Sequence, residues 1–584
     1  MQPIDQKNLI LFIAFMFAIL IGYQFYLDLV IDPQQEQQRQ ALEQAAPAPD
    51  GTATVPRPEG AQPQATAPTA GVRPRATVLA EAPRLAVDTA ALSGSISLTG
   101  GRFDDLTLNR YKVTTAPDSP NINLLAPVDT TAPYFADFGW IDDAGAVYGG
   151  GGTAWQSDGG VLTPTSPVRL SYRAENGLRF ERTVAIDENY MFTITQRLVN
   201  NGSEPVTLFP YGRVTRIGKP PTVDFYILHE GPMGVFDGTL KEYDYGDLED
   251  DGRIDVTSTG GWIGITDKYW LAALVPDQQE EVRSRFTFGN EGGVKRYQVD
   301  YLGSARPIAP GSSVEMTNRL FAGAKLVRLM DRYRDELGID RFDLAIDFGW
   351  FFYITKPLFY AILYLNDLLG NFGLAILALT VGVKLAFFPL ANKSYKSMSK
   401  MKALQPQMTE LKERHGDDRQ KLQQEMMALY KREKVNPVSG CLPIAVQIPV
   451  FFALYKVLFV AIEMRHAPFY GWIRDLSAPD PTTIFNLFGL IPFDPPTFLM
   501  IGVWPLIMGI TMFLQQKLNP APPDPIQAKI FTFLPIIFTF ILAGFPAGLV
   551  IYWAWNNALS ILQQYVIMRR MGVPIGGGRV KQTT

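Results

Sequence analysis

Lys384 is the residue whose type and position most invite a chemical explanation. It interrupts the strongly apolar run LALTVGVKLAFFPL at residues 377–390. Burying an ammonium group is costly, so such a lysine escapes to water, lines a hydrated cavity or awaits a negative partner. It lies about six residues, or ~9 Å along a helix, from the end of the run, which a stretched lysine stem partly covers. This distance alone does not decide between a Lys384 that snorkels to water and a Lys384 that faces a polar interior.

Polar side chains in neighbouring apolar runs favour the polar interior. Thr380 lies one helical turn from Lys384, and Gln447 lies in the next long apolar run. The last such run carries five more: Asn556, Asn557, Ser560, Gln563 and Gln564. Amides that face lipid leave hydrogen bonds unmade, so helices turn them toward each other or toward water. Each alone is more typical of helix packing, but together they predict a hydrated pocket in the inner half of a bilayer.

Catalytic and metal-binding motifs are absent from the sequence. It contains no GxxxxGK[ST] phosphate loop, no HExxH and no GxSxG. The stretch DLEDDGRIDV imitates a calcium loop, but Ser258 stands where such a loop has its bidentate glutamate. With one cysteine and three scattered histidines, a zinc site is not expected. We therefore predict no catalytic residue, no metal and no cofactor.

Composition indicates a chain with both soluble and membrane parts. Of its 584 residues, 47% are hydrophobic and only 19% are charged, which does not fit one ordinary soluble domain. The net charge of −4 argues against sequence-specific or general nucleic-acid binding.

Changes in residue pattern divide the chain into successive segments. Residues 8–27 are uncharged and long enough to cross a bilayer, and no small-residue cleavage site follows that would mark a signal peptide. A Pro-, Gln- and Ala-rich stretch comes next, and then alternating segments such as VRLSYRAENGLRFERTVAI at 168–186 predict strands. The predicted domains are a transmembrane anchor (1–31), a disordered linker (32–75), a β-sandwich (76–335), an interfacial amphipathic helix (340–368), a five-helix membrane core (369–568) with a helical hairpin (393–436), and a basic tail (569–584).

Six transmembrane helices are predicted in a defined orientation. After the anchor, spans are expected at 371–391, 441–462 and 498–514, and the 39 uncharged residues 530–568 form two more, broken at FPAG. Eleven Lys and Arg residues lie between 393 and 434, which places that loop in the cytoplasm. Both termini are then cytoplasmic and the β-sandwich is periplasmic. Lys456 falls in the outer leaflet, where snorkelling is the preferred interpretation.

The hairpin carries a methionine-rich apolar stripe. Met401, Met408 and Met426 recur at helical spacing. Methionine suits adaptable contacts with varied partners, although packing between the two helices explains the same stripe. The hairpin's net positive charge also fits binding to anionic lipid.

The later part of the sequence closely resembles one family, the YidC membrane protein insertases. The match covers about 340 to 570, including SYKSMSKMKALQPQMTELKERHGDDRQKLQQEMMALYKREKVNPVSGCLPIAVQIPVFFALYKVLF and FTFLPIIFTFILAGFPAGLVIYWAWNNALSILQQ. The anchor, linker and sandwich match the form found in bacteria with two membranes, whose periplasmic domain resembles mutarotase-like supersandwiches.

The resemblance implies a mechanism without covalent chemistry. Newly made proteins would enter an inner-leaflet groove that contains a positive residue, here Lys384, and their hydrophobic segments would pass along the third and fifth spans into lipid. Groove residues carried over from the family and the polar pattern are Lys384, Thr380, Gln447, Asn556, Asn557 and Gln564. Tyr552 and Trp553 would meet the substrate's apolar face. The implied partners are nascent membrane proteins, the Sec translocon, the signal recognition particle with its receptor, and the ribosome, although the short tail weakens the case for ribosome docking there.

Two other functions fit parts of the sequence. An ion- or proton-coupled transporter would use Lys384 as its coupling charge, but residues 371–391 and 530–568 contain no acidic partner. A membrane-anchored periplasmic carbohydrate-active domain would place the function in the sandwich instead.

Overall fold

The computed structural model describes residues 72–222, 228–349, 352–415, 418–433, 435, 442–489, 491, 495–496, 500–519 and 525–571. The predicted anchor at 8–27, most of the linker and the tail beyond 571 lie outside them. The chain divides into two compact units, Arg57–Pro520 with Leu534–Thr584, and Met1–Pro56 with Ala521–Phe533. Of the second unit, only the first residues of one helix, α13, are described.

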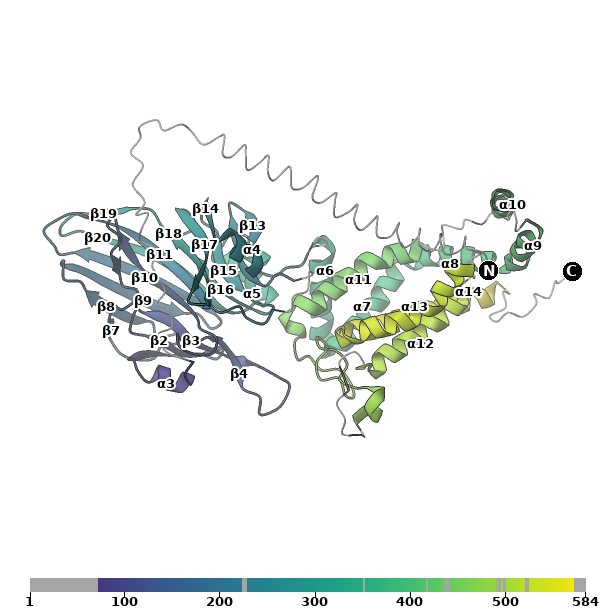
Figure 1. Ribbon diagram of the computed structural model, residues 1–584, viewed down its shortest axis with the longest axis horizontal. Coiled ribbons are helices and arrows are strands. Elements are labelled where there is room, and N and C mark those ends of the chain that lie inside the picture. Colours follow the sequence, from purple (N-terminus) through teal and green to yellow (C-terminus); the bar gives the residue numbers. More distant parts are fainter. Residues whose placement is uncertain are drawn as a thin grey trace, which may run out of the picture. The chain divides into compact units, whose positions relative to one another are not determined.

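Antiparallel strands form an 11-stranded and a 9-stranded sheet within the described residues (Figure 1). In pairing order, the first sheet contains β1 (Arg84–Asp88), β2 (Leu92–Ser97), β3 (Arg102–Lys112), β5 (Tyr134–Asp142), β11 (Val206–Ile217), β18 (Val294–Leu302), β17 (Glu281–Glu291) and β14 (Arg253–Thr259). Shorter strands pair beside this path: β4 (Asn121–Leu125) with β3, β6 (Val147–Tyr148) with β5, and β19 (Arg306–Ile308) with β11. The second sheet contains β13 (Thr239–Glu242), β12 (Gly231–Phe236), β15 (Trp262–Thr266), β16 (Trp270–Val275), β20 (Ser313–Ala324), β10 (Met191–Asn200), β9 (Leu178–Ile186), β8 (Val168–Arg173) and β7 (Gln156–Ser157).

Alternation along the strands explains why the two sheets form a sandwich. In β9, every second residue from Leu178 to Ile186 is buried, while those between are partly exposed. Such a period of two places one face of a strand in a core. The predicted all-β sandwich is therefore confirmed. Two short helices, α3 (Arg75–Leu79) and α4 (Tyr245–Asp251), accompany the strands.

Buried arginines in the sandwich have partners inside it. Arg213 on β11 and Asp137 on β5 are register partners, and their side chains form an ion pair at 2.6 Å with at most 2% exposure. Arg182 is also fully buried; it donates to the Phe138 carbonyl at 2.6 Å and lies over the Trp155 ring. Burial lowers the pKa of Arg182 to about 10.

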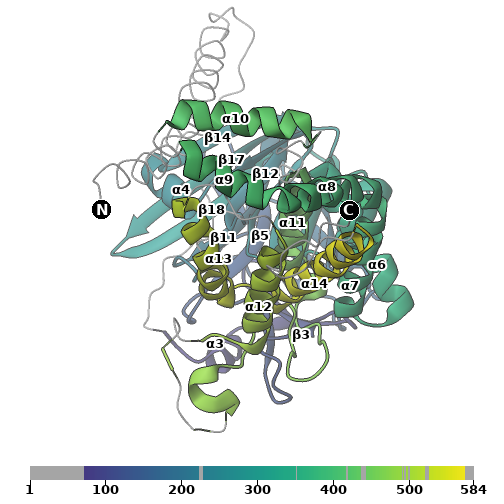
Figure 2. The ribbon, with the colours of Figure 1, turned by 90° about the vertical axis from the view of Figure 1, so that its right-hand side faces the viewer.

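Helices and the loops that connect them make up the remainder of the described chain. The helices are α5 (Val327–Glu336), η2 (Phe342–Ala345), α6 (Phe352–Leu369), α7 (Phe372–Ala386), α8 (Phe388–Ala403), α9 (Gln405–His415), α10 (Arg419–Arg432), α11 (Leu442–Val460), η4 (Ile462–Met464), η5 (Ile484–Gly489), α12 (Val503–Leu518), α13 (Pro525–Ala543) and α14 (Ala547–Arg570). Figure 2 shows α7, α12, α13 and α14 from a second direction.

A sharp bend separates α7 from α8. The predicted span at 371–391 crosses it, because α7 ends at Ala386 and α8 departs at 70°. Pro389 lies in the first turn of α8, where its missing N–H and fixed φ are tolerated at a helix start but not inside a continuous helix. By length and hydropathy, no single described helix suffices to cross a membrane; the bent pair of α7 and α8 is long and apolar enough together, and the apolar segments Gln447–Val460 of α11 and Ala528–Ala543 of α13 are shorter.

Specific contacts join the β-sandwich to α11 and the residues after it. Lys456 is mostly buried, and its Nζ lies 2.5 Å from Asp347 Oδ2. Glu463 accepts the backbone N–H of Val327 at the start of α5, at 3.0 Å. The preferred interpretation of Lys456 as a snorkelling lysine was wrong, because its ammonium is held by a carboxylate rather than released to solvent.

Breaking the buried pair Arg213–Asp137 should destabilise the sandwich. We expect Arg213→Met to cost about 3–5 kcal/mol, because it leaves a buried carboxylate without a partner. The double variant Arg213→Met, Asp137→Leu should recover most of that loss. Urea denaturation of segment 72–348 measures both; a single variant within about 1 kcal/mol of wild type would contradict this account.

Candidate functional site

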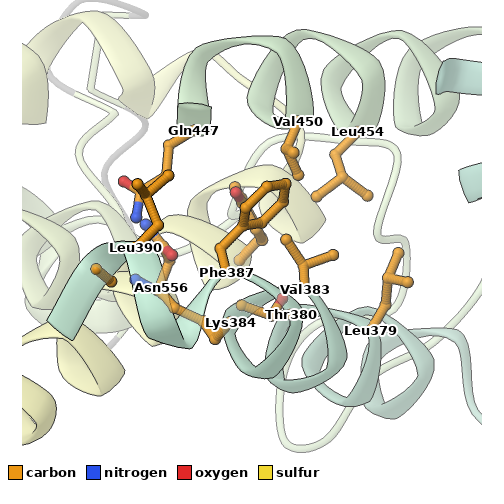
Figure 3. A pocket seen from close by; sticks show the side chains of 12 residues that line it. Leu379, Thr380, Val383, Lys384, Phe387, Leu390, Gln447, Val450, Leu454 and Asn556 are labelled. Carbon is orange, nitrogen blue, oxygen red and sulfur yellow. The ribbon is translucent and has the colours of Figure 1, made fainter. Parts of the chain in front are cut away.

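A pocket lies between α7, the start of α8, α11 and α14. Its lining consists of Leu379, Thr380, Val383, Lys384, Phe387, Leu390, Ala391, Gln447, Val450, Leu454, Tyr552 and Asn556. In Figure 3, Val450 and Leu454 project from α11 toward Val383 and Phe387. The cavity measures about 40 Å³, which is enough for a few water molecules. Most of its walls are apolar, and its polar groups are few.

Helical periodicity brings these side chains together. On α7, Thr380, Val383 and Lys384 are three and four residues apart, the spacing that places side chains on one face. On α11, Gln447, Val450 and Leu454 follow the same rule, and Tyr552 precedes Asn556 by one turn on α14. One face of each of the helices α7, α11 and α14 therefore lines the pocket.

The Lys384 ammonium has a hydroxyl partner and no acidic one among the described residues. Its Nζ donates to Ser560 Oγ at 2.6 Å, and that hydroxyl donates to the Asn556 carbonyl at 2.9 Å. No ion pair involving Lys384 occurs in the described part of the chain. An ammonium carries three donors, so Ser560 leaves it able to bind an incoming acceptor.

The position of Lys384 at a helix end reduces the cost of its charge. It lies in the last turn of α7, just before the bend at Phe387. The carbonyls at a helix C-terminus carry partial negative charge, which favours a cation there. The bend therefore places the Lys384 charge at the C-terminal end of α7, where an apolar helix tolerates a cation best.

The structure brings five of the predicted groove and contact residues into this pocket. Lys384, Thr380, Gln447, Asn556 and Tyr552 line it. The Thr380 hydroxyl donates to the carbonyl of Ile376 at 2.7 Å, so its methyl group is what remains for contact.

The other three lie elsewhere on α14. Asn557 donates to Thr511 Oγ1 on α12 at 3.4 Å, and Gln564 donates to Asn519 Oδ1 at 3.1 Å. Trp553 packs against Phe451 and Phe538, with ring centroids 4.8 and 5.4 Å away. These contacts turn the three side chains toward α11, α12 and α13 rather than into the pocket.

Of the three predicted methionines, Met401 lies near the end of α8, and Met408 and Met426 lie in the hairpin of α9 and α10, which run side by side in Figures 1 and 2. Met408 is buried with Leu429 and Tyr430, and Met401 and Met426 pack against this cluster. Their apolar surface is largely used within the hairpin. Met427, which the sequence analysis did not select, is 46% exposed.

Ser560 is the residue that sequence reasoning failed to assign to the site. The sequence marks it as a polar residue of the last apolar run, but not as the partner of Lys384. Its spacing of one turn from Asn556 was the available signal, because that spacing puts both on one face.

Comparisons with known proteins agree over nearly the whole chain. A family described as the YidC periplasmic domain matches residues 84–361, and one described as the 60Kd inner membrane protein matches residues 364–573. A membrane protein insertase YidC from Methylobacterium sp. (strain 4-46) is 52% identical over 98% of this chain and 96% of its own.

Solved structures also align with parts of the chain. One, described as an active YidC insertase with the first transmembrane domain resolved, aligns over 82% of this chain and 92% of its own at 18% identity and a TM-score of 0.37. A galactose mutarotase related enzyme from Lactobacillus acidophilus aligns over 41% of this chain and 97% of its own at 8% identity and a TM-score of 0.29.

Two lysines of apolar helices should respond differently to the same substitution. Lys456→Met should destabilise the protein by about 1–3 kcal/mol, since it leaves Asp347 without its partner. Lys384→Met should not lower stability, because it removes a charge that has no acidic partner. The measurement is thermal aggregation of the full chain in detergent; equal losses for both variants would mean that Lys384 is a structural residue.

Proposed function

The chain belongs to the YidC family of membrane protein insertases, and from this premise we propose that the pocket beside Lys384 is where it receives newly made membrane proteins. It is an inner-membrane protein with a periplasmic β-sandwich. The observation that carries the proposal is an ammonium among apolar walls that has no acidic partner in the described part of the chain. In this proposal, a hydrophilic or acidic outer segment of the substrate enters the pocket and pairs transiently with Lys384.

Exposed apolar side chains support the second step, in which the substrate's hydrophobic segment passes into lipid. On α13, Ile536, Phe540 and Ile541 are about half exposed, and on α11 so are Ile448 and Phe452. A substrate helix that slides along such faces exchanges water for apolar surroundings at about 25 cal/mol per Å². That gain drives insertion without nucleotide hydrolysis.

A lysine at this position suits brief and unselective pairing. Arginine binds a carboxylate through a planar fork with two parallel hydrogen bonds, whereas lysine is a compact, hydrated point charge. Lys384 therefore acts through charge and hydration rather than through a shaped receptor. Substrates with different outer segments then use the same pocket.

The topology and partners follow from the same proposal. The chain crosses the membrane six times, with both termini and the α9–α10 hairpin in the cytoplasm. Pocket residues Lys384 and Ser560 then lie toward the cytoplasmic side, where substrates arrive from the ribosome, alone or with the Sec translocon. The signal recognition particle and its receptor are candidate delivery partners, and the basic hairpin binds anionic lipid.

A function located in the sandwich would give a different result on deletion. Removing most of residues 76–330 should leave insertion largely intact, because the pocket belongs to α7, α8, α11 and α14. Loss of insertion with a folded helical core would move the function to the sandwich. The assay is insertion of a model substrate into vesicles that contain the deletion variant.

The role of the charge is tested with pairs of substrates. Lys384→Ala should reduce insertion of a substrate with an acidic outer segment by roughly tenfold, the effect of losing one charge-assisted hydrogen bond of about 1.5 kcal/mol. Its partner substrate, with amides in place of the acids, should be much less affected. Lys384→Arg should retain activity, and Lys396→Ala on the exposed face of α8 serves as a matched control. Insertion into vesicles is measured by protease protection, and an equal loss for both substrates would refute charge pairing.

A further inference from the structure

The loop between α11 and α12 displays large apolar side chains to the surroundings. Phe485, Leu487, Phe488 and Ile491, here called the η5 patch, are between 44% and 54% exposed. Residues 481–493, PTTIFNLFGLIPF, contain no charge. Single exposed apolar residues are ordinary on a protein surface, but several close together mark an interaction site.

The backbone holds this patch in a conformation that costs energy. Leu487 and Phe488 both have left-handed dihedrals, with φ of 50° and 59°. Side chains with a Cβ disfavour that region, and two in succession persist only where surroundings maintain them. Two backbone hydrogen bonds do so here, from Phe488 N–H to the Thr483 carbonyl at 2.9 Å and from Ile491 N–H to the Asn486 carbonyl at 3.0 Å. The strained turn keeps apolar groups outside instead of folding them under the loop.

The part of the loop that precedes the patch is fixed to the helices. Ile473 and Leu476 are fully buried and pack with Ala547 and Ile551 at the start of α14. Asp480 is a second anchor of this part of the loop.

Asp480 ties the loop to the first turn of α12. It is 3% exposed, and its carboxylate accepts from the Trp504 backbone at 2.9 Å and from Trp472 Nε1 at 3.0 Å. Trp472 thus has a satisfied N–H and a ring that is 40% exposed. A tryptophan with a bonded polar edge and an open apolar face is typical of the boundary between lipid and water.

Apolar side chains are also exposed on the helix that follows the loop. Along α12, which starts after the loop, Ile510, Phe513 and Leu514 are 41–60% exposed. Arg465, where the loop begins, donates to the backbone carbonyl of Lys112 at the end of β3 at 2.6 Å. The loop therefore lies at the end of the helices that contacts the sandwich.

We propose that the η5 patch inserts into the membrane leaflet on the sandwich side and anchors the α11–α12 loop at the lipid surface. Lipid fits better than a protein partner, because the segment has no charged groups to form the polar rim that surrounds the apolar core of a protein interface. The apolar side chains enter the acyl region, and Trp472 lies at the headgroup level. Anchoring there holds the first turn of α12, and through Asp480 the loop, at a defined depth.

Depth-dependent quenching tests this proposal on the full-length protein. Cys441, the single cysteine, is replaced by serine, and Leu487→Cys is labelled with an environment-sensitive fluorophore in vesicles of phosphatidylethanolamine and phosphatidylglycerol. Nitroxide lipids labelled near the headgroup or near the acyl-chain end report depth. Val294→Cys on the sandwich and Leu562→Cys on α14, both exposed apolar positions, are the aqueous and deep controls.

The label at Leu487 should be blue-shifted and quenched by the shallow nitroxide, unlike the label at Val294. Quenching no stronger than at Val294 would overturn the proposal, as would a shielded label that no nitroxide quenches, since a protein would then cover the patch. Phe485→Cys provides a second probe at a residue without left-handed backbone, in case Leu487→Cys fails to fold. Adding Leu487→Asn and Phe488→Asn to Phe485→Cys should abolish its quenching, and undiminished quenching would contradict the role of the patch.

Discussion

The function proposed for the helical core depends on placing one ammonium group inside an apolar pocket without an acidic partner among the described residues. Three features make this tolerable for Lys384. It occupies the last turn of α7, it donates to Ser560, and the bend before α8 opens the helix end beside it. Each lowers the cost of the charge, yet none neutralises it. The remaining attraction for an anion is what the pocket offers a substrate.

Other buried cations in the described part of the chain are held in different ways. Arg213 is paired with Asp137 inside the sandwich, and Lys456 is paired with Asp347 where the sandwich meets α11. In both places a carboxylate lies within ion-pair distance of the cation. Arg182 and Lys325 form no ion pair among the described residues: Arg182 donates to the Phe138 carbonyl and lies over the Trp155 ring, and Lys325 donates to Thr266 Oγ1 at 2.8 Å. Lys384 resembles Lys325 in having a hydroxyl partner, but it lines a pocket.

The sandwich and the pocket were predictable from the sequence to different degrees. Alternation of apolar and polar residues in segments such as β9 predicts strands, because it requires only that one face of the strand is buried. Four residues of the pocket, Lys384, Thr380, Gln447 and Asn556, followed from polarity within apolar runs, whereas Tyr552 followed from the resemblance to the insertase family. Polarity does not reveal how each helix is rotated, so Asn557 and Gln564 face α12 instead. The Lys456–Asp347 pair joins residues 109 positions apart, a contact that no local pattern signals.

The most direct measurement is site-specific photocrosslinking from the pocket to a ribosome-bound membrane protein. Crosslinkers at Thr380 and Val383, which line the pocket, are compared with one at Leu562, which is exposed on α14. The account predicts that the two pocket positions capture the acidic outer segment of the nascent chain and that Lys384→Ala weakens this capture. Crosslinks at Leu562 alone, or none at either pocket position, would contradict it.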